Sequence, residues 1–285
     1  MGTKFRVSFY TQDSQKAEKA AQDTVERIAA LNAIFSDYEP ESELSRLNRA
    51  EAGKPFAASL ELYGLISRAH ELSAATDGAF DITCGNLTRL WRRTRDQKKL
   101  PPPDRLQKAL AATDYRALAL DPSSRSLTLK RAGMLIDLGG IAKGRAADEA
   151  LRLLRERHGI RRALVIAGGD IAIGTAPPDA AGWEIKLRTQ SLAATDNRLT
   201  TLILAERGVS TSGDLYQYIE IDDTRYAHIV SPKTGLGLTQ RIACTVIAPD
   251  CTTSDALATA MCVLGREKGT LAAAQVAGVE LLWPE

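Results

Sequence analysis

The sequence has few cysteines, and their spacing excludes the usual structural roles. The 285 residues include four cysteines, Cys84, Cys244, Cys251 and Cys262, and these form no C-x-x-C or Cys/His pattern. A chain of this length can bury a substantial apolar core without cross-links. We therefore expect free thiols, and neither a disulfide scaffold nor a structural zinc site.

Long apolar runs and an excess of one charge are also missing. No 18 consecutive residues are apolar and the start "MGTKFRVSFY" is unlike a signal peptide, so we expect no membrane-spanning segment. The 37 basic and 35 acidic residues leave a formal net charge of +2, which gives no electrostatic reason to expect nucleic acid or an anionic membrane as a partner. Local basic clusters, such as "RLWRRTRDQKK" at 89–99, are typical of solvated surface.

Hydrophobic periodicity predicts a mixed fold. Helical spacing of apolar residues predicts helices over 14–36, 60–75, 141–157, 254–264 and about 266–277. Strand patterns occur at 4–10, 133–138, 163–169, 183–189, 199–206, 226–232 and 243–249. Three prolines predict a loop over 98–104. Strands mostly follow one another as hairpins, so we expect one α+β domain over 1–285, with largely antiparallel, mixed sheets and interspersed helices.

The segment "DLGGIAKGRAAD", 137–148, joins a predicted strand to a predicted helix through two glycines. Gly139 and Gly140 remove side chains where a helix begins, and the free N–H groups of a helix start suit a phosphate. The spacing fits neither G-x-G-x-x-G nor the P-loop pattern. Ordinary turn chemistry also explains the glycines and is the interpretation that this segment alone favours, although the phosphate interpretation stays open.

Two further segments carry candidate chemistry. Asp255 and Thr259 are four residues apart and share one face of a predicted helix, where their oxygens could bind a hard cation such as magnesium. Alternatively, Asp255 only favours the helix start and Thr259 bonds back along the helix. His228 lies within the strand pattern at 226–232 and is either a general base or a hydrogen-bonded histidine at a strand end.

The order of these segments resembles the ApbE family of FAD:protein FMN transferases. The resemblance covers nearly the whole chain and depends most on "DLGGIAKG", "HIVSPKTG" and "DALATA", together with "SDYEPESELSRLN", "GAFDIT", "AGGDIAIG" and "STSGD". It implies an ApbE-like fold related to the T-fold, with a cleft for FAD between an N-terminal and a C-terminal part. Two positions depart from the pattern: Ser231 replaces an aspartate of many relatives, and Ala258 replaces a second acid found in some.

The resemblance also implies a role for each matching residue. Asp255, Thr259 and the carbonyl of Ala142 would bind Mg²⁺, and His228 would activate the incoming hydroxyl. Lys143 or the helix N–H groups would balance phosphate charge. Contacts to FAD are implied for Met1, Tyr38, Ala79, Phe80, Asp81, Gly140 and Ile229.

The implied reaction is a Mg²⁺-dependent transfer of FMN from FAD to a threonine or serine hydroxyl of an acceptor protein, with release of AMP. Two alternatives stay open at this point: an FAD pyrophosphatase that gives FMN and AMP, and a protein that binds FAD without chemistry. Family members are usually extracytoplasmic and often lipid-anchored. We therefore expect a periplasmic or other extracytoplasmic location, with membrane attachment only through a leader absent from this chain, although a cytoplasmic location is also compatible.

Overall fold

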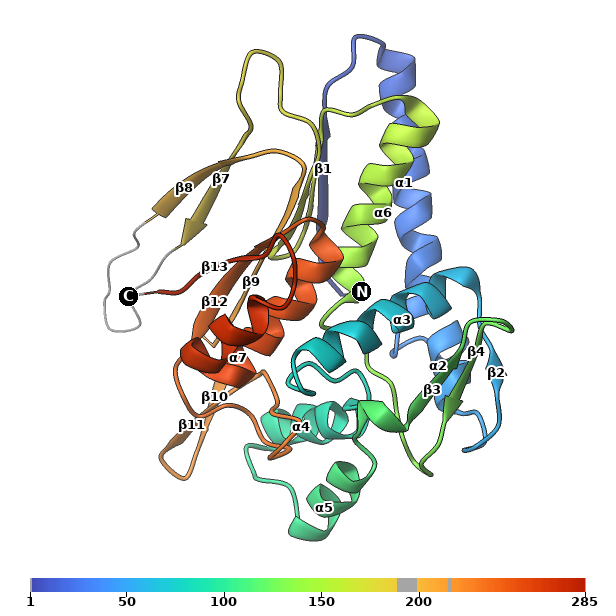
Figure 1. Cartoon of the computed structure of the whole chain (residues 1–285), viewed down its shortest axis with the longest axis vertical. Coiled ribbons are helices and arrows are strands. Elements are labelled where there is room, and N and C mark those ends of the chain that lie inside the picture. Colours follow the sequence, from blue (N-terminus) through green and yellow to red (C-terminus); the bar gives the residue numbers. More distant parts are fainter. Residues whose placement is uncertain (1, 189–198, 215–216, 285) are drawn as a thin grey trace.

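The computed structural model describes residues 2–188, 199–214 and 217–284, and these ranges form a central sheet with helices packed on it (Figure 1). The helices are α1 (Ser14–Phe35), α2 (Glu43–Asn48), α3 (Leu60–Ala75), α4 (Gly85–Gln97), α5 (Pro103–Ala111), α6 (Ala142–His158) and α7 (Cys251–Ala273), with a 3-10 turn at Tyr115–Ala117. The strands are β1 (Phe5–Phe9), β2 (Phe56–Ala57), β3 (Leu118–Asp121), β4 (Ser126–Leu129), β5 (Ala163–Ala167), β6 (Asp170–Ile173), β7 (Trp183–Arg188), β8 (Leu199–Leu204), β9 (Arg207–Gly213), β10 (Tyr218–Ile221), β11 (Thr224–Ala227), β12 (Ala243–Ala248) and β13 (Glu280–Leu282).

The main sheet is antiparallel, in the order β1-β5-β6-β9-β12-β13. Successive strand side chains point to opposite faces, and β12 shows the result. Val246 packs in the large core cluster that includes α7, whereas its neighbour Ile247 packs with the β7–β8 hairpin. The sheet is therefore covered by α6 and α7 on one face and by β7–β8 on part of the other. The remaining strands form a β10–β11 hairpin and a small β2-β4-β3 sheet.

The helices α6 and α7 approach each other closely near their N-terminal ends. A Cβ at Gly144 of α6 would lie 2.2 Å from the carbonyl oxygen of Cys251 and 2.9 Å from Cβ of Asp255 in α7. Only glycine allows this separation. The crossing brings the start of α6 against the carboxylate of Asp255, which accepts a hydrogen bond from the Gly144 N–H at 3.0 Å.

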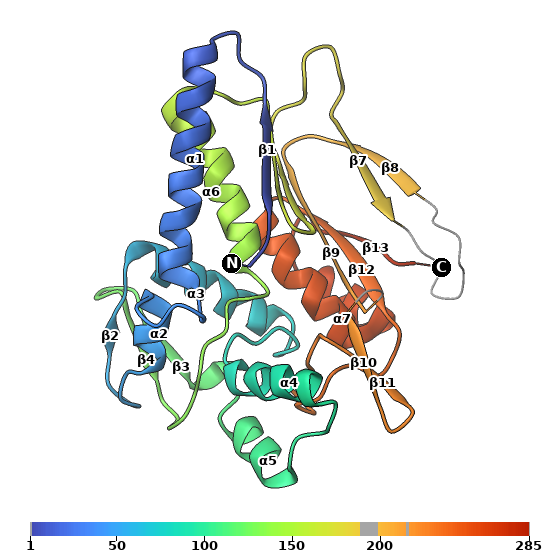
Figure 2. The same ribbon diagram turned by 180° about the vertical axis from the view of Figure 1, so that it is seen from behind.

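The N-terminal helices complete the other side of the core. α3 buries one face, with Leu62, Leu65, Ile66, Ala69 and Leu72 at helical spacing, all at most 1% exposed. Asp13 caps the start of α1, because its side chain accepts a hydrogen bond from the Lys16 N–H. The helix then runs beside α6 (Figure 2). α3 contacts both α1 and α7, and α4 supplies part of the wall of the candidate site.

Several predicted elements are confirmed and others are corrected. The helices predicted over 14–36, 60–75 and 141–157 correspond to α1, α3 and α6. The two predicted C-terminal helices form the continuous span α7, which breaks its helical geometry at Gly265 (φ 78°). The strand predicted at 133–138 is wrong, because this segment forms only a single bridge, between Leu135 and Cys84. Its backbone bonds to the 82–85 segment: the Gly85 N–H donates to the Leu135 carbonyl, and the Asp137 N–H donates to the Ile82 carbonyl.

The expected absences can be checked within the described ranges. All four cysteines are free thiols. Among the residues that the structure describes, none of the helices has both the length and the apolar character needed to cross a bilayer.

Candidate active site

A cavity of about 660 Å³ collects residues from distant parts of the chain. Its walls come from residues 79–95, from the two glycine junctions at 137–143 and 169–170, and from residues 211–259. This volume lies within the range of small-molecule sites, about 300–1,000 Å³. The N-terminal and C-terminal halves of the chain therefore enclose one hollow between them.

The ammonium group of Lys143, a residue of the cavity wall, lies between two buried carboxylates. Its Nζ is 3.1 Å from Oδ1 of Asp255 and 3.1 Å from Oδ2 of Asp170. It also donates to the Gly139 carbonyl at 3.2 Å. Asp255 and Asp170 are only 3% and 4% exposed, so their negative charges require a cation at this place.

The electrostatics of this cluster follow from having two acids around one ammonium. Burial and the negative charge of Asp255 raise the pKa of Asp170 to about 7, although Lys143 and Ser210 oppose the shift. Burial by itself lowers the pKa of Lys143, but Asp255 and Asp170 outweigh it and raise the pKa above its ordinary value. Lys143 is therefore charged, and it serves as the cluster's internal cation.

The oxygen donors of this cluster fit a hard divalent cation. Asp255 supplies a carboxylate, and Thr259, one turn further along α7, also lines the cavity. A Cβ at Gly140 would meet Phe80 at 3.3 Å and the Thr259 hydroxyl at 3.5 Å, so main chain from the glycine junction faces Thr259 directly. Ala142 is the first residue of α6, beside Lys143. Its carbonyl as a metal ligand stays a prediction.

His228 lies on the cavity wall immediately after β11. Its Nδ1 is 3.3 Å from the carbonyl oxygen of Gln217. Because a carbonyl only accepts, this contact places the proton on Nδ1 and leaves the Nε2 lone pair free. Burial lowers the pKa of His228, with the Gln217 hydrogen bond opposing and Arg95 adding to the shift. The imidazole is therefore neutral at pH 7 and competent to accept a proton.

The residues expected to contact flavin divide into two groups. Ala79, Phe80, Asp81, Gly140 and Ile229 all line the cavity. Phe80 and Ile229 also belong to the apolar core, which holds their positions. The carboxylate of Asp81 accepts from the Thr83 N–H, the Thr83 hydroxyl and the Tyr115 N–H, so its main visible contacts are structural.

Tyr38 lies outside the cavity lining and is 71% exposed. Its ring is covered by the guanidinium of Arg92, with 4.7 Å from Cζ to the ring centroid. Arg92 is itself part of the cavity wall and pairs with Asp37 at 2.7 Å and Asp137 at 3.1 Å. Tyr38 is thus connected to the cavity wall through Arg92. Met1 lies outside the described residues.

Sequence reasoning missed several charged residues of this cavity, among them Arg92 and Asp170. Arg92 belongs to the basic cluster at 89–99 that the sequence analysis placed on solvated surface, but the structure buries part of it against Asp37 and Asp137. Asp170 was visible only as the acid after a second glycine pair. Its pairing with Lys143 has no signal in the sequence, because 27 positions separate the two residues and the sheet brings them together.

Comparison with known proteins supports the resemblance to the ApbE family. The family model described as "ApbE family" matches residues 1–283. A FAD:protein FMN transferase of Vibrio cholerae is 31% identical over 94% of this chain and 80% of its own length, and one of Treponema pallidum is 31% identical over 99% and 82%. The apo flavinyl transferase ApbE of Pseudomonas stutzeri has a TM-score of 0.87 at 28% identity, covering 99% of this chain and 88% of its own.

These similarities extend over nearly the whole chain, so they concern the complete arrangement of sheet and helices. The predicted α+β fold and the predicted enzyme class, an ApbE flavin transferase, are both confirmed. The chain belongs to the ApbE family.

Proposed function

We propose that this enzyme carries out a Mg²⁺-dependent transfer of FMN from FAD to a threonine or serine hydroxyl of an acceptor protein. The observation that carries the proposal is the meeting of four features in one cavity: the Lys143–Asp170–Asp255 cluster, Thr259, the Gly140 main chain and the neutral His228. Charge neutralisation and positioning are what a phosphoryl transfer demands of a protein. The names of the relatives support FAD as the donor.

Asp255 and Thr259 would hold the metal ion, with the Ala142 carbonyl as a third protein ligand. Bound Mg²⁺ neutralises charge on phosphoryl oxygens and on a leaving phosphate. The Lys143 ammonium lies where it can move from the carboxylates to the diphosphate of FAD, because its side chain is held only by ion pairs and the Gly139 carbonyl. Beside it, the Phe80 ring offers an apolar surface, and Gly140 leaves main chain that no side chain covers.

The step itself needs one proton acceptor. The acceptor hydroxyl oxygen forms a bond to the phosphorus of the FMN half, and the bond from that phosphorus to the bridging oxygen breaks. The hydroxyl proton passes to Nε2 of His228, and AMP leaves with the bridging oxygen. Holding the acceptor in line with the leaving group supplies most of the remaining rate, since orientation replaces a bimolecular encounter.

The decisive experiment is mass spectrometry of a candidate acceptor protein after incubation with the enzyme, FAD and Mg²⁺. We expect a hydroxyl residue of the acceptor to gain the mass of FMN less one water. Asp255→Asn should abolish this product, because the amide keeps an acceptor for the Gly144 N–H but loses the charge that binds a cation. The matched control on the same helix, exposed Glu267→Gln, should behave like the wild type.

Other outcomes would redirect the proposal. Free FMN and AMP without a modified acceptor would favour a pyrophosphatase. Binding of FAD without any turnover in the presence of Mg²⁺ would favour a binding protein. The extracytoplasmic location expected from the family resemblance stays a prediction.

A further inference from the structure

A second cavity, of about 480 Å³, lies on the other side of α6 from the flavin site. It shares no lining residue with the first cavity among the residues that the structure describes. On α6, Arg145, Asp148 and Arg152 line it; at 100° per residue these positions lie roughly opposite Lys143. Its wall contains six arginines, from four separate parts of the chain: Arg68, Arg145, Arg152, Arg155, Arg161 and Arg207.

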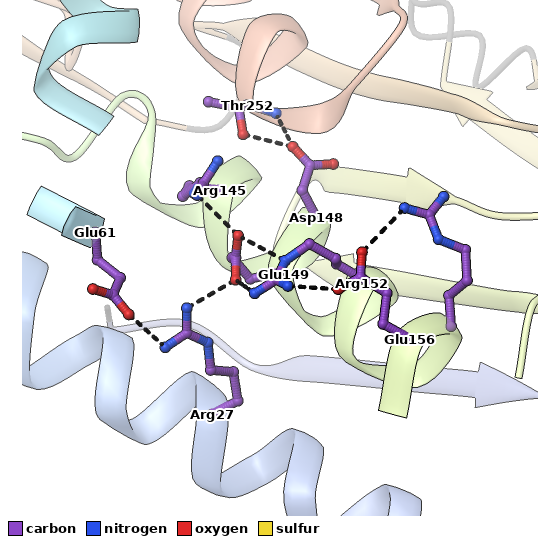
Figure 3. A network of polar contacts seen from close by, with 9 residues as sticks. Arg27, Glu61, Arg145, Asp148, Glu149, Arg152, Glu156 and Thr252 are labelled. Carbon is purple, nitrogen blue, oxygen red and sulfur yellow. Dashed lines mark hydrogen bonds and ion pairs between the residues drawn. The ribbon is translucent and has the colours of Figure 1, made fainter. Parts of the chain in front are cut away.

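The acidic residues in this wall are already occupied. Glu149 accepts from Arg27 and Arg152 at 2.8 Å each and pairs with Arg145 at 2.9 Å (Figure 3). Asp148 accepts from the N–H groups of Cys251 and Thr252 at the start of α7. These carboxylates therefore have little capacity left for the remaining arginines.

The other two acids of the wall are engaged in the same way. Asp250 caps α7 through the Thr253 N–H at 2.7 Å, and Glu206 accepts from the Thr175 hydroxyl at 2.7 Å. The four acids of this wall thus serve the helix start, a neighbouring hydroxyl or the Glu149 cluster. Six arginines against four acids leave the cavity with a formal excess of two positive charges.

Two arginines of the wall have no acidic partner within the described residues. Arg161 makes no side-chain ion pair there, and the guanidinium of Arg207 donates only to the backbone carbonyl of Glu206 at 3.1 Å. Arg155 has one acidic contact, 3.8 Å from Glu156, and that carboxylate is held at 2.7 Å by Arg152. Several guanidinium groups therefore line this cavity with N–H donors to spare.

We propose that this cavity binds a small phosphate-bearing anion. Guanidinium groups present paired N–H donors that match phosphate oxygens, and a phosphate carries enough oxygens to bond to two arginines at once. The volume is that of a small-molecule site, which favours a compact ligand over a protein segment. A bound anion would contact the same wall as Asp148 and Thr252, which join α6 to α7 one turn away from Gly144 and Asp255.

The proposal can be tested by isothermal titration of the full-length protein with inorganic pyrophosphate, without metal and at physiological ionic strength. We expect saturable binding with one site, unaffected by an excess of FAD. The double variant Arg161→Gln/Arg207→Gln should lower the affinity at least tenfold. Both side chains are on exposed residues outside the Glu149 network, so the thermal midpoint should stay close to that of the wild type.

The matched control is Arg266→Gln, an exposed arginine of α7 outside the cavity, which should bind pyrophosphate like the wild type. Absence of saturable binding, displacement by FAD, or an equal loss in the control would overturn the proposal. Equally tight binding of citrate, or binding of an acidic peptide alone, would overturn the assignment to phosphate. Each of these outcomes is independent of flavin transfer to an acceptor.

Discussion

The carboxylate of Asp81 connects the segment that follows α3 to the 3-10 turn at Tyr115. It accepts from the Thr83 N–H at 2.8 Å, from the Thr83 hydroxyl at 2.6 Å and from the Tyr115 N–H at 3.0 Å. Burial raises the pKa of Asp81, while these hydrogen bonds oppose the shift. The residue therefore shapes the cavity wall that Ala79 and Phe80 share, whatever contact it also makes with a ligand.

Asp81→Ala should lower the free energy of unfolding by about 2–4 kcal/mol, because each buried donor left unpaired costs about 1–3 kcal/mol. Urea denaturation measures this. The control Asp77→Asn removes the charge of an exposed carboxylate that pairs with Arg116 on the surface and keeps a residue that tolerates the φ of 47° at this position; it should change stability by less than about 1 kcal/mol. Unchanged stability together with lost FAD affinity in Asp81→Ala would assign the residue to ligand binding instead.

His228 has a lowered pKa and a proton position set by Gln217. A base in this state loses its function when protonated, so transfer should slow as the pH falls below the ordinary histidine range, about 6.5.

His228→Ala should lower kcat far more than it weakens FAD binding, measured by flavin fluorescence. Lys233→Ala, in the same loop but exposed, is the control. Equal losses of rate and affinity would contradict the role as base.

The crossing of α6 and α7 decides where the charged cluster forms. Gly144 permits the contact with Cys251, and Asp255 then reaches both the Gly144 N–H and the Lys143 ammonium. On the sheet side, a Cβ at Gly208 of β9 would lie 2.3 Å from backbone atoms of Asp250 and Cys251. The start of α7, one turn before Asp255, is therefore held tightly between α6 and β9.

Gly144→Ala should lower the free energy of unfolding by about 3 kcal/mol and displace Asp255, because overpacked contacts force the backbone apart. Calorimetry and a metal-binding titration would measure the two effects. Gly64→Ala is the matched control: it lies in α3 with no atom within 4 Å of its new Cβ, so it should stabilise the protein by roughly 0.5–1 kcal/mol. A neutral result for Gly144→Ala would contradict the tight crossing.

Helices with a strong periodicity of apolar residues could be predicted from the sequence. Elements that depend on contacts with distant residues could not. α1 and α3 repeat apolar residues at helical spacing, so their bounds were predicted to within a residue or so. α4 carries many arginines and few apolar residues, and it was not predicted. Its buried Trp91 forms a hydrogen bond to the Ala227 carbonyl at 3.0 Å, a contact 136 positions away that no local pattern contains.

Across the whole molecule, one ion network joins the N-terminal helices to the sheet-bound helix. Arg27 of α1 contacts Glu61 of α3 and Glu149 of α6, and Arg145 and Arg152 complete the shell around Glu149 (Figure 3). Burial would raise the pKa of Glu149, but Arg152, Arg27 and Arg145 lower it from 4.5 to about 2. The ionised form of Glu149 is therefore more stable in the folded state than in the unfolded chain.

This difference predicts acid sensitivity. Between pH 4.5 and about 2 the unfolded chain binds the proton more readily at this site, so the stabilisation from Glu149 is present above pH 4.5 and is lost as the pH falls through this range. Glu149→Gln should lower stability at pH 7 by roughly 1.5–3 kcal/mol and flatten the acid limb of the stability curve.

The control for this experiment is Glu51→Gln, which removes an exposed pair with Lys54. It should leave both the stability at pH 7 and its acid dependence nearly unchanged. Denaturant midpoints measured from pH 7 to pH 3 would test both variants. An acid limb in Glu149→Gln as steep as that of the wild type would show that other carboxylates cause it.

The sequence by itself determined the family, the main helices, and the motifs that supply Asp255, Thr259, His228 and the glycine junction. These depend on local spacing and on a series of short segments in a fixed order. Tertiary structure alone decided that Lys143 lies between Asp170 and Asp255, that Arg92 reaches the cavity wall, and that α6 presents arginines to a second hollow. Such contacts arise when the fold brings residues that are distant in the sequence within hydrogen-bonding range. The spacing of residues along the chain does not predict such contacts.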